Sequence, residues 1–593
     1  MSTKELITDH LDLWTGAVTH KSGTGRGNNG KIELTGIKKL RELILELAVR
    51  GKLVEQDPSE EPASVLLDRI AEEKTRLVKE GKIKKPKNLK EVADEEKPFG
   101  LPEGWAWARM EAVSEYIQRG KGPKYAESGK VRVISQKCVQ WSGLNLSTTR
   151  FVDDNSLNGY QDERYIRKND ILWNSTGTGT VGRAIVVKEP QHSTVVDSHV
   201  TIVRPLITEP CHILNYISSP SIQKRIEPDH KDSLVSGSTK QVELNSGSVK
   251  LLAVPLPPLS EQHRIVEKVD ELMALCDRLE QQVGDQLEAH EVLVDTLLDA
   301  LTRSTDAAES TENWARVAEH FDTLFTTEAS IDKLKKTILQ LAVMGRLVEQ
   351  DPGDEPASVL LERIAEEKAQ LVKEGKIKKT KKIPDVTEDD FLFELPKDWA
   401  WTRFENIVDP KFSISYGVLV PGPEPKNGVP LVRVADLSLS NPSDQPEKSI
   451  SHEVDKKFAK TRLNGGEILL CVVGSIGKLG VAPNSWKGAN IARAICRIMP
   501  TKLVSESYIL MLLQTEFMQV RFGKDTRTLA QPTLNVGLIR SASTPLPPFE
   551  EQKRIVDKVD KLMALCDQLK VRLAKAGETR KHLIETVVEQ AVG

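Results

Sequence analysis

The sequence is poor in cysteine and aromatic residues and has no long apolar run. Its six cysteines include no C-x-x-C pair, a pattern that argues against a zinc ribbon or a disulfide framework and predicts buried thiols. No apolar run approaches the roughly 20 residues that span a bilayer, and the N-terminus is too acidic and polar for a signal peptide. We therefore expect a cytoplasmic protein without membrane association.

The familiar motifs of enzymes are also missing. There is no [DN]-P-P-[YF] tetrad, no H-E-x-x-H, no G-x-S-x-G and no spaced carboxylate set typical of a nuclease. Gly177, Gly179 and Gly182 match G-x-G-x-x-G, but the strand-like RAIVV follows where a helix is needed, so we expect a hairpin. His199 near Asp197 is expected to be ordinary loop polarity. We predict no catalytic residue and no metal site.

An internal repeat organises the chain. Residues 37–87 match 331–381 with 38 of 51 positions identical, and residues 255–279 match 545–569 with 19 of 25 identical. The stretches between them look unrelated apart from a few anchors. These anchors pair Gln241, Leu244 and Asn245 with Gln531, Leu534 and Asn535. A duplication with constant arms and divergent middles predicts that the arms do one job twice, while the middles do two versions of another.

The repeat sets the expected domain boundaries. The arms and the N-terminal segment are 1–36, 37–100, 255–394 and 545–593. Two variable domains, 101–254 and 395–544, lie between them. We expect a flexible linker at 21–30, which is rich in Gly and Asn, and a second linker at 304–330.

The arms carry the apolar spacing of coiled-coil helices. After each PLPP tetrad, apolar residues alternate by four and three positions, and an upstream helix has a similar stripe that ends at a glycine. The first stripe is Ile265, Val269, Leu272, Cys276, Leu279 and Val283, with its copy at Ile555, Val559, Leu562, Cys566, Leu569 and Leu573. The upstream stripe is Ile37, Leu40, Ile44 and Leu47, with its copy at Ile331, Leu334, Ile338 and Leu341. A further helix is expected from Pro62 to Gly81, and again from Pro356 to Gly375.

These helices need partners for their apolar seams. The central arm contains both kinds of helix in series, whereas the other set is divided between the two ends of the chain. We predict that the terminal arm 545–593 pairs with 37–100 and copies the central arm, which gives antiparallel coiled-coil helices in a pseudo-twofold, circular arrangement. The alternative is that each helix packs only on its own domain.

Both variable domains have the pattern of mixed α/β (α+β) folds. In the first, strands are expected at 131–135, 170–175, 183–187 and 199–205, followed by a helix at 213–226. The second repeats this order with LVRVADL, EILLCVVG and ARAICRIMP before the helix SYILMLLQTEFMQVRF.

Charge separates the variable domains from the arms. Residues 101–254 hold 19 Lys and Arg against 16 Asp and Glu, a net charge of +3, and residues 395–544 hold 19 against 13, a net charge of +6. Since the whole chain carries −3, the rest carries −12. Basic domains on an acidic scaffold suit a polyanion, because phosphate contacts supply much of the affinity for DNA. The excess is modest, and an ordinary solvated surface stays an alternative.

Several phrases resemble one family. PLPPLSEQHRIVEKVDEL and its copy resemble the "PPL-x-EQ-x-x-IV" pattern of specificity subunits from type I restriction–modification systems. LPEGWAW and LPKDWAW resemble the start of that family's target recognition domains, and KNDILWNSTGTGTVG and NGGEILLCVVGSIG resemble its "GDIL…G" segment. The resemblance spans nearly the whole chain, and the long N-terminal arm resembles the subclass called type IB.

The resemblance implies a non-catalytic subunit that recognises double-stranded DNA. It implies assembly with two modification (methyltransferase) subunits and, in the ATP-dependent nuclease, two restriction subunits. S-adenosylmethionine, ATP and magnesium would be used by those partners and not by this chain. Each recognition domain would recognise one half of a split, asymmetric site, and the arms would set the gap, as in other two-headed DNA-binding proteins.

Candidate contact residues come from chemistry, because the family pattern does not mark them. Polar side chains in the loops of each domain could pair with base edges or phosphates. In the first domain we select Lys121, Lys124, Gln136, Lys137, Ser175, Thr176, Thr178, Lys240 and Gln241. In the second we select Ser415, Tyr416, Arg433, Ser475, Lys478, Arg527, Thr528 and Gln531. Gln241 and Gln531 could instead be structural, since both copies share them.

Two other classes of function stay open at this point. A structural adaptor could use the duplicated domains to bind proteins, and a fused enzyme is weakened by the missing motifs. Salt-dependent binding to duplex DNA separates the first alternative from a DNA-recognising subunit.

Overall fold

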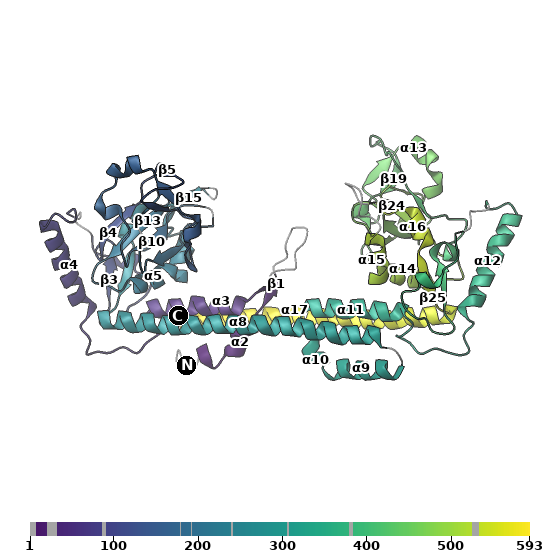
Figure 1. Ribbon diagram of the computed structural model, residues 1–593, viewed down its shortest axis with the longest axis horizontal. Helices are drawn as coiled ribbons and strands as arrows, with labels where there is room; N and C mark the ends of the chain where they lie inside the picture. Colours follow the sequence, from purple (N-terminus) through teal and green to yellow (C-terminus); the bar gives the residue numbers. More distant parts are fainter. Residues whose placement is uncertain are drawn as a thin grey trace. The chain divides into compact units, whose positions relative to one another are not determined.

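A computed structural model describes residues 7–20, 32–85, 90–177, 179–190, 193–238, 241–304, 307–378, 383–524 and 533–593. The chain divides into two compact units (Figure 1). The first contains residues 1–286 and 576–593, and the second contains residues 287–575. Each unit combines a helical arm with one variable domain of mixed strands and helices, as predicted.

The arm of the first unit is built on α3 and on parts of two long helices. These are α3 (Thr35–Val49), α8 (Leu259–Arg303) and α17 (Phe549–Val592). The predicted apolar stripes of α3 and of the first part of α8 are buried. Arg41 of α3 lies 2.6 Å from Asp277 and 3.0 Å from Glu280 of α8. The helix α3 ends before Gly51, which has a φ of 67°. Glycine adopts this left-handed conformation readily because it has no Cβ.

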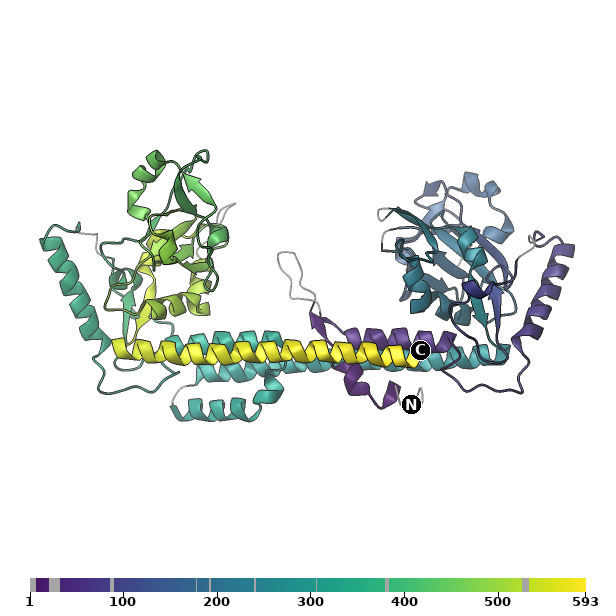
Figure 2. The same cartoon turned by 180° about the vertical axis from the view of Figure 1, so that it is seen from behind.

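The C-terminal end of the chain belongs to this same arm. Arg50 after α3 donates to the carbonyl oxygen of Val592 at 3.4 Å, and Arg580 donates to the carbonyl oxygen of Gly16 at 2.7 Å. The end marked C lies beside α3 and α8 in both views (Figures 1 and 2). The prediction that the terminal helices come together is therefore confirmed within the first unit.

The N-terminal segment is partly structured. A short helix, α2 (Leu11–Thr15), contains a fully buried Trp14, and β1 (Thr19–His20) pairs with β2 (Ile32–Glu33). The predicted linker at 21–30 lies outside the described residues. The apolar side chain of Trp14 anchors a segment that its polar sequence led us to treat as separate from the fold.

The arm of the second unit follows the same plan with different ion pairs. Its helix α11 (Glu328–Val343) packs beside α17, and Lys335 lies 2.6 Å from Asp567. Lys570 of α17 lies 2.6 Å from Asp332 of α11. The residues of the upstream stripe, Ile331, Leu334, Ile338 and Leu341, are buried as predicted.

The linker prediction for 304–330 is wrong. Two helices occupy this stretch, α9 (Ala307–Glu319) and α10 (Phe321–Leu324). Val317 and Leu324 are buried in the same core as Leu298 of α8. The apolar residues are sparse in this polar stretch, but their helical spacing gives them one common face.

A separate helix leads from each arm to its variable domain. These helices are α4 (Ala63–Lys79) and α12 (Ala357–Lys373), and each ends before a glycine with φ of 69°, Gly81 or Gly375. Their bounds agree with the sequence prediction.

The first variable domain contains two four-stranded sheets. The first has the order β11-β10-β13-β4 and is antiparallel, and the second has the order β12-β6-β9-β5 with β12 parallel to β6. The strands of the first sheet are β4 (Ser114–Arg119), β10 (Ile171–Asn174), β11 (Ala184–Val186) and β13 (Val200–Pro205). Those of the second are β5 (Tyr125–Ala126), β6 (Arg132–Ile134), β9 (Arg150–Val152) and β12 (Thr194–Val196). The G-x-G-x-x-G stretch joins β10 to β11, which confirms a hairpin.

The second variable domain repeats this topology. One sheet has the order β18-β24-β21-β22, and the other has the order β20-β19-β23 with β19 parallel to β23. The strands of the first sheet are β18 (Ser415–Tyr416), β21 (Ile468–Cys471), β22 (Leu479–Val481) and β24 (Ile495–Ile498). Those of the other are β19 (Val429–Val432), β20 (Lys448–Ile450) and β23 (Asn490–Ile491).

The helix predicted in each variable domain is divided into two shorter helices. In the first domain it consists of α5 (Pro210–Ser218) and α6 (Pro220–Gln223), because Pro220 keeps Ser219 in an extended conformation. In the second it is divided at Thr515 into α14 (Glu506–Gln514) and α15 (Glu516–Lys524). The Thr515 hydroxyl accepts from the backbone N–H of Met518 at 3.3 Å and so caps the second piece.

Candidate nucleic-acid interface

The first and last strands of each variable domain pair with one another. In the first domain β3 (Ala106–Arg109) is antiparallel to β16 (Ala253–Leu256), and in the second β17 (Ala400–Arg403) is antiparallel to β25 (Ser543–Leu546). The chain therefore enters and leaves each domain at one place, directly before the long helix of the arm.

The shared E-Q dipeptide at the start of each long helix ties the domain to the arm. The Glu261 carboxylate accepts from Trp105 Nε1 at 3.0 Å and from Gln56 Nε2 at 2.7 Å. Gln262 accepts from the backbone N–H of Glu209 at 2.9 Å, which fixes the start of α5. Burial raises the pKa of Glu261, against the effect of its hydrogen bonds.

The second unit repeats these bonds residue by residue. Glu551 accepts from Trp399 Nε1 at 3.0 Å and from Gln350 Nε2 at 2.8 Å. Gln552 accepts from the backbone N–H of Ser505 at 2.8 Å. The repeated phrases on either side of each variable domain therefore meet in space, and they hold the domain on its arm.

The acidic residue of the "GDIL" segment is also structural. Asp170 is fully buried and lies 2.6 Å from Arg204 on the neighbouring strand β13. Glu467 takes its place in the second domain, 3.7 Å from Arg497 of β24. Each acid also accepts backbone N–H groups of the turn before its strand. The residues that the two domains share therefore maintain the fold of each domain.

The loops between the strands of each domain gather at one edge of the sheets. In the first domain β4 and β10 end opposite the start of β13, with Arg119 beside Thr201 and Asn174 beside Val200. The parallel strands β6 and β12 end at the same place, because three residues connect β12 to β13. We call the loops at this place the loop edge, which comprises residues 120–125, 135–137, 175–177 and 197–199 in the first domain. In the second it comprises residues 417–424, 433–436, 472–478 and 492–494.

Side chains of the first loop edge form a connected polar network. Thr176 Oγ1 lies 2.6 Å from His199 Nδ1, and Asp197 accepts from the His199 backbone N–H at 2.8 Å. Tyr125 donates to Asp197 at 3.2 Å, and burial raises the pKa of that carboxyl. The histidine ring is bonded to the threonine rather than to the carboxylate, and the ordinary loop polarity of His199 stays a prediction.

The predicted contact residues of the first domain divide into three groups. Lys121, Lys124 and Lys137 are exposed, while Gln136 and Thr176 are half-buried. Ser175 is fully buried and lies 2.5 Å from Thr201 Oγ1, so its selection as a contact residue is corrected. It immediately follows the buried strand β10, and its side chain points into the core with the alternation of that strand. Thr178, Lys240 and the side chain of Gln241 lie outside the described residues.

In the second domain, three of the five predicted contact residues that the structure describes are engaged internally. Tyr416 donates to the carbonyl oxygen of Leu534 at 3.1 Å, and Arg433 lies 3.0 Å from Glu447. Lys478 donates to the carbonyl oxygen of Val434 at 2.9 Å. Ser475 is exposed in a turn and Ser415 is half-buried in β18. Arg527, Thr528 and Gln531 lie outside the described residues, and the contact roles of all these residues stay predictions.

Sequence reasoning did not select several exposed residues of these domains as contacts. His199, Arg493, Leu419 and Val420 all lie at a loop edge. The selection favoured polar residues beside glycines, which passed over the apolar pair. Aligning the two domains by their strand ends would have found it, because residues 417–424 then correspond to residues 120–125.

The shared anchors at the end of each domain support structure. Leu244 and Leu534 are buried, and their backbone N–H groups donate at 2.8 Å to the carbonyl oxygens of Ser175 and Val472. Asn245 and Asn535 cap the short helices that follow.

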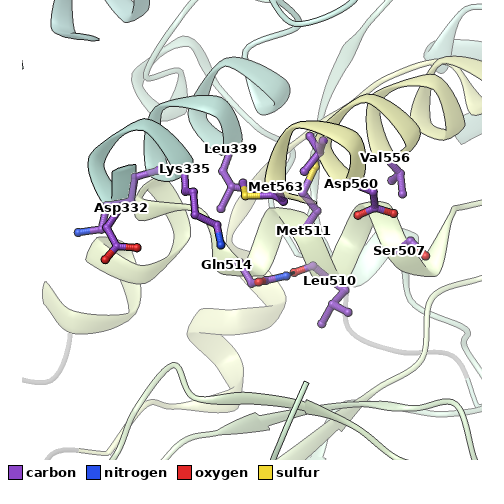
Figure 3. A pocket seen from close by; sticks show the side chains of 12 residues that line it. Asp332, Lys335, Leu339, Ser507, Leu510, Met511, Gln514, Val556, Asp560 and Met563 are labelled. Atoms are coloured by element: carbon purple, nitrogen blue, oxygen red, sulfur yellow. Dashed lines mark hydrogen bonds between the residues drawn. The ribbon is translucent and has the colours of Figure 1, made fainter. Parts of the chain in front are cut away.

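A cavity of about 750 Å³ lies where the second domain packs on its own arm (Figure 3). Asp332 and Lys335 of α11, Met511 of α14 and Met563 of α17 are among its lining residues. The lining contains no cysteine or histidine, and the charged residues at its rim form ion pairs between arm helices. The cavity is a packing seam between the arm and the domain.

The described residues contain no cluster of metal ligands, and burial affects the thiols of Cys496 and Cys276. No group of three or more His, Cys, Asp or Glu within the described ranges could hold a metal ion. Burial raises the pKa of Cys496 to about 12 and that of Cys276 to about 11, which keeps these thiols protonated. No helix in the described part of the chain is long and apolar enough to cross a membrane.

Fold and site together define a duplicated binding protein. Two domains of one topology are held on matching arms by the same bonds, and they differ at the edge where their loops gather. Such a pair presents two different surfaces on one kind of scaffold.

Comparison with known proteins identifies the family. Residues 102–289 and 423–575 match the family described as Type I restriction modification DNA specificity domain. Over the full length of both chains, the protein is 38% identical to the Type I restriction enzyme EcoEI specificity subunit and 38% identical to the EcoAI specificity subunit, both from Escherichia coli. The chain therefore belongs to the specificity subunits of type I restriction–modification systems, with two target recognition domains.

A solved structure gives a more distant match. The crystal structure of the HsdS subunit from Thermoanaerobacter tengcongensis is 18% identical in sequence and superimposes with a TM-score of 0.42. The match covers 84% of this chain and 98% of that one.

Proposed function

We propose that this chain is the non-catalytic, DNA-recognising subunit of a type I restriction–modification complex. Each variable domain recognises one half of an asymmetric, two-part site in double-stranded DNA. The observation that carries the proposal is the contrast between the units: bonds that hold each domain are repeated, whereas the residues of the two loop edges differ. Two different surfaces cannot recognise the two identical halves of a palindrome.

The arms are proposed to set the spacer between the half-sites and to bind two modification subunits. Identical exposed residues support the second role. Ser64, Val65 and Lys79 on α4 recur as Ser358, Val359 and Lys373 on α12, and all six are exposed. A partner that binds twice needs the same surface twice.

The reaction itself is assigned to the partners. Two modification subunits would methylate adenine with S-adenosylmethionine, and two restriction subunits would use ATP and magnesium. This chain determines which DNA sequence the complex binds. We place the complex in the cytoplasm, where it meets unmodified DNA.

The proposal is tested by measuring DNA binding by the chain assembled with its modification subunit. We expect affinity for mixed duplex DNA to fall as salt rises, and methylation to occur at one bipartite sequence. The chain alone should neither methylate nor cleave DNA. Salt-independent binding, or turnover by the purified chain, contradicts the proposal.

A further inference from the structure

The loop that follows β18 in the second domain occupies the same place as residues 120–125 of the first domain, which we call the lysine loop. Gly120 packs on the backbone of Val196 and Asp197 so closely that a Cβ would collide with their carbonyl oxygens. Gly417 meets the carbonyl oxygen of Ile491 in the same way. Both loops therefore leave the sheet from equivalent points, where β12 or β23 ends.

The two loops carry opposite chemistry. Residues 120–125 contain two exposed lysines, Lys121 and Lys124, whereas residues 417–424 contain no lysine or arginine. In their place, the side chains of Leu419 and Val420 are 57% and 75% exposed. Because these two aliphatic side chains are exposed, the fold lacks the roughly 25 cal/mol of stabilisation per Å² that burying their apolar surface would contribute.

Leu419 and Val420, which we call the apolar tip, are held in place at the base of their loop. Val418 donates its backbone N–H to Ile491 at 2.7 Å, and its carbonyl oxygen accepts from the backbone N–H of Arg493 at 2.9 Å. Beyond the tip, Pro421 and Pro423 flank Gly422, which has a φ of 72°. Proline restricts the backbone, so the tip is presented in a defined conformation at little entropic cost.

The chain anchors the far side of this loop as well. Lys448 on β20 lies 2.7 Å from Glu424, which ties the loop to the second sheet of the domain. The exposed side chains of Leu419 and Val420 therefore lie on a loop that has contacts with the rest of the domain on both sides of the tip.

The setting favours DNA over a protein as the occupant. The tip lies at the loop edge of a domain whose net charge is +6, and the exposed Arg493 follows the residue that pairs with Val418. A protein partner that binds twice would meet the same chemistry in both units, yet here it would meet lysines once and aliphatic residues once. Two different DNA half-sites do not require the same side chains in both units.

We propose that Leu419 and Val420 contact the 5-methyl group of a thymine in the half-site of the second domain. The inference rests on the proposed function. The thymine methyl is the one apolar group at the edges of base pairs in the major groove, and aliphatic side chains distinguish it from the other bases. Arg493 is exposed, its backbone N–H bonds to Val418, and in this proposal its side chain binds a neighbouring phosphate or guanine edge. The first domain uses its lysine loop for phosphate contacts instead.

The test replaces each thymine of the mapped half-site, one at a time, by deoxyuridine, which removes only the methyl group. With the full chain and its modification subunit, one such replacement should weaken binding about fourfold, the value expected for one buried methyl. The L419A/V420A variant should bind unmodified DNA about four- to tenfold more weakly and should no longer distinguish thymine from uracil at that position. Its salt dependence should equal that of the wild type, because no phosphate contact is removed.

Leu538→Ala is the matched control, since Leu538 is an exposed aliphatic residue of the same domain, on the helix Val536–Ser541 and outside the loop edge. It should behave as the wild type on every DNA. The inference is overturned if the half-site contains no thymine, if L419A/V420A still distinguishes thymine from uracil, or if it binds all sequences equally weakly. Loss of the modification subunit from L419A/V420A would make the tip a protein contact and also overturns it. If the wild-type complex shows no sequence-specific DNA binding, the proposed function fails instead.

Discussion

At the scale of single residues, the lysine loop of the first domain makes a quantitative prediction. Within the described part of the chain, Lys121 lies 5.5 Å from the Tyr160 ring and 3.4 Å from the carbonyl oxygen of Gly159. An exposed cation with such weak contacts is available to a phosphate. K121A/K124A should lower the slope of log affinity against log salt by about 1 to 2, since each phosphate contact contributes roughly 0.9.

Lys168→Ala is the control for that measurement. Lys168 pairs with Glu189 at 3.2 Å and precedes β10, at the end of the sheet opposite to the loop edge. The slope measured for K168A should equal that of the wild type. An unchanged slope for K121A/K124A would remove the lysine loop from the DNA interface.

A buried histidine predicts how the first unit responds to acid. His212 is fully buried, Nε2 lies 3.1 Å from the carbonyl oxygen of Pro255, and burial lowers its pKa to about 4. The unfolded chain takes up this proton near pH 6.5, whereas the folded chain does not. Stability is therefore complete above pH 6.5 and falls as the pH drops toward 4, by up to about 3 kcal/mol.

The second unit shows which substitution removes this effect. Tyr508 of α14 donates to the carbonyl oxygen of Pro545 at 2.9 Å, the equivalent bond. In the H212Y variant, the difference in unfolding free energy between pH 7 and pH 4.5, measured by urea denaturation, should be smaller than in the wild type. An equal difference in both proteins would show that His212 does not titrate as described.

At the scale of elements, the start of each long helix is predicted to fix its variable domain. Glu551→Ala leaves the buried Trp399 Nε1–H without its acceptor, at a cost of about 1–3 kcal/mol. Hydrogen exchange in β17 should accelerate accordingly. Glu551→Gln keeps an acceptor and should change the exchange much less.

The neighbouring glutamate separates this bond from general effects on the helix. Glu550 is exposed and pairs only with Lys553, at 3.0 Å. Glu550→Ala should leave exchange in β17 unchanged, since exposed pairs contribute little. If both alanine variants behaved alike, the attachment of the domain through Glu551 would be wrong.

The elements also show what the sequence could predict. Regular apolar spacing located α3, α8, α11 and α17, because helices with a single buried face leave a periodic pattern. The helices α9 and α10 were missed, since they bury only a few side chains each. The break after α5 was also missed, although Pro220 stands there in the sequence. Thr515 gives no such signal, because its capping bond is visible only in the folded chain.

The candidate site was less predictable than the fold. Ser175 and Thr176 are adjacent in sequence, yet one is buried and the other reaches the loop edge. The loops that meet there are far apart along the chain, so only the sheet topology brings them together. Leu419 and Val420 have the composition of a core strand, and they stand out only when the strand ends of the two domains are aligned.

At the scale of the whole molecule, the arms are predicted to control the spacing of the target. An insertion of four residues in the central arm adds about 6 Å of helix, or about two base pairs of DNA. Sequencing of modified adenines should show a longer spacer with both half-sites retained. An unchanged spacer would show that the arms do not measure it.

The central claim is that each variable domain recognises its own half of the DNA target. Its most direct test is to exchange residues 108–254 for the corresponding region of a relative and to map the methylated adenines across the genome. The account predicts that one half-site changes while the other half-site and the spacer stay the same. A change in both half-sites, or in neither, would contradict it.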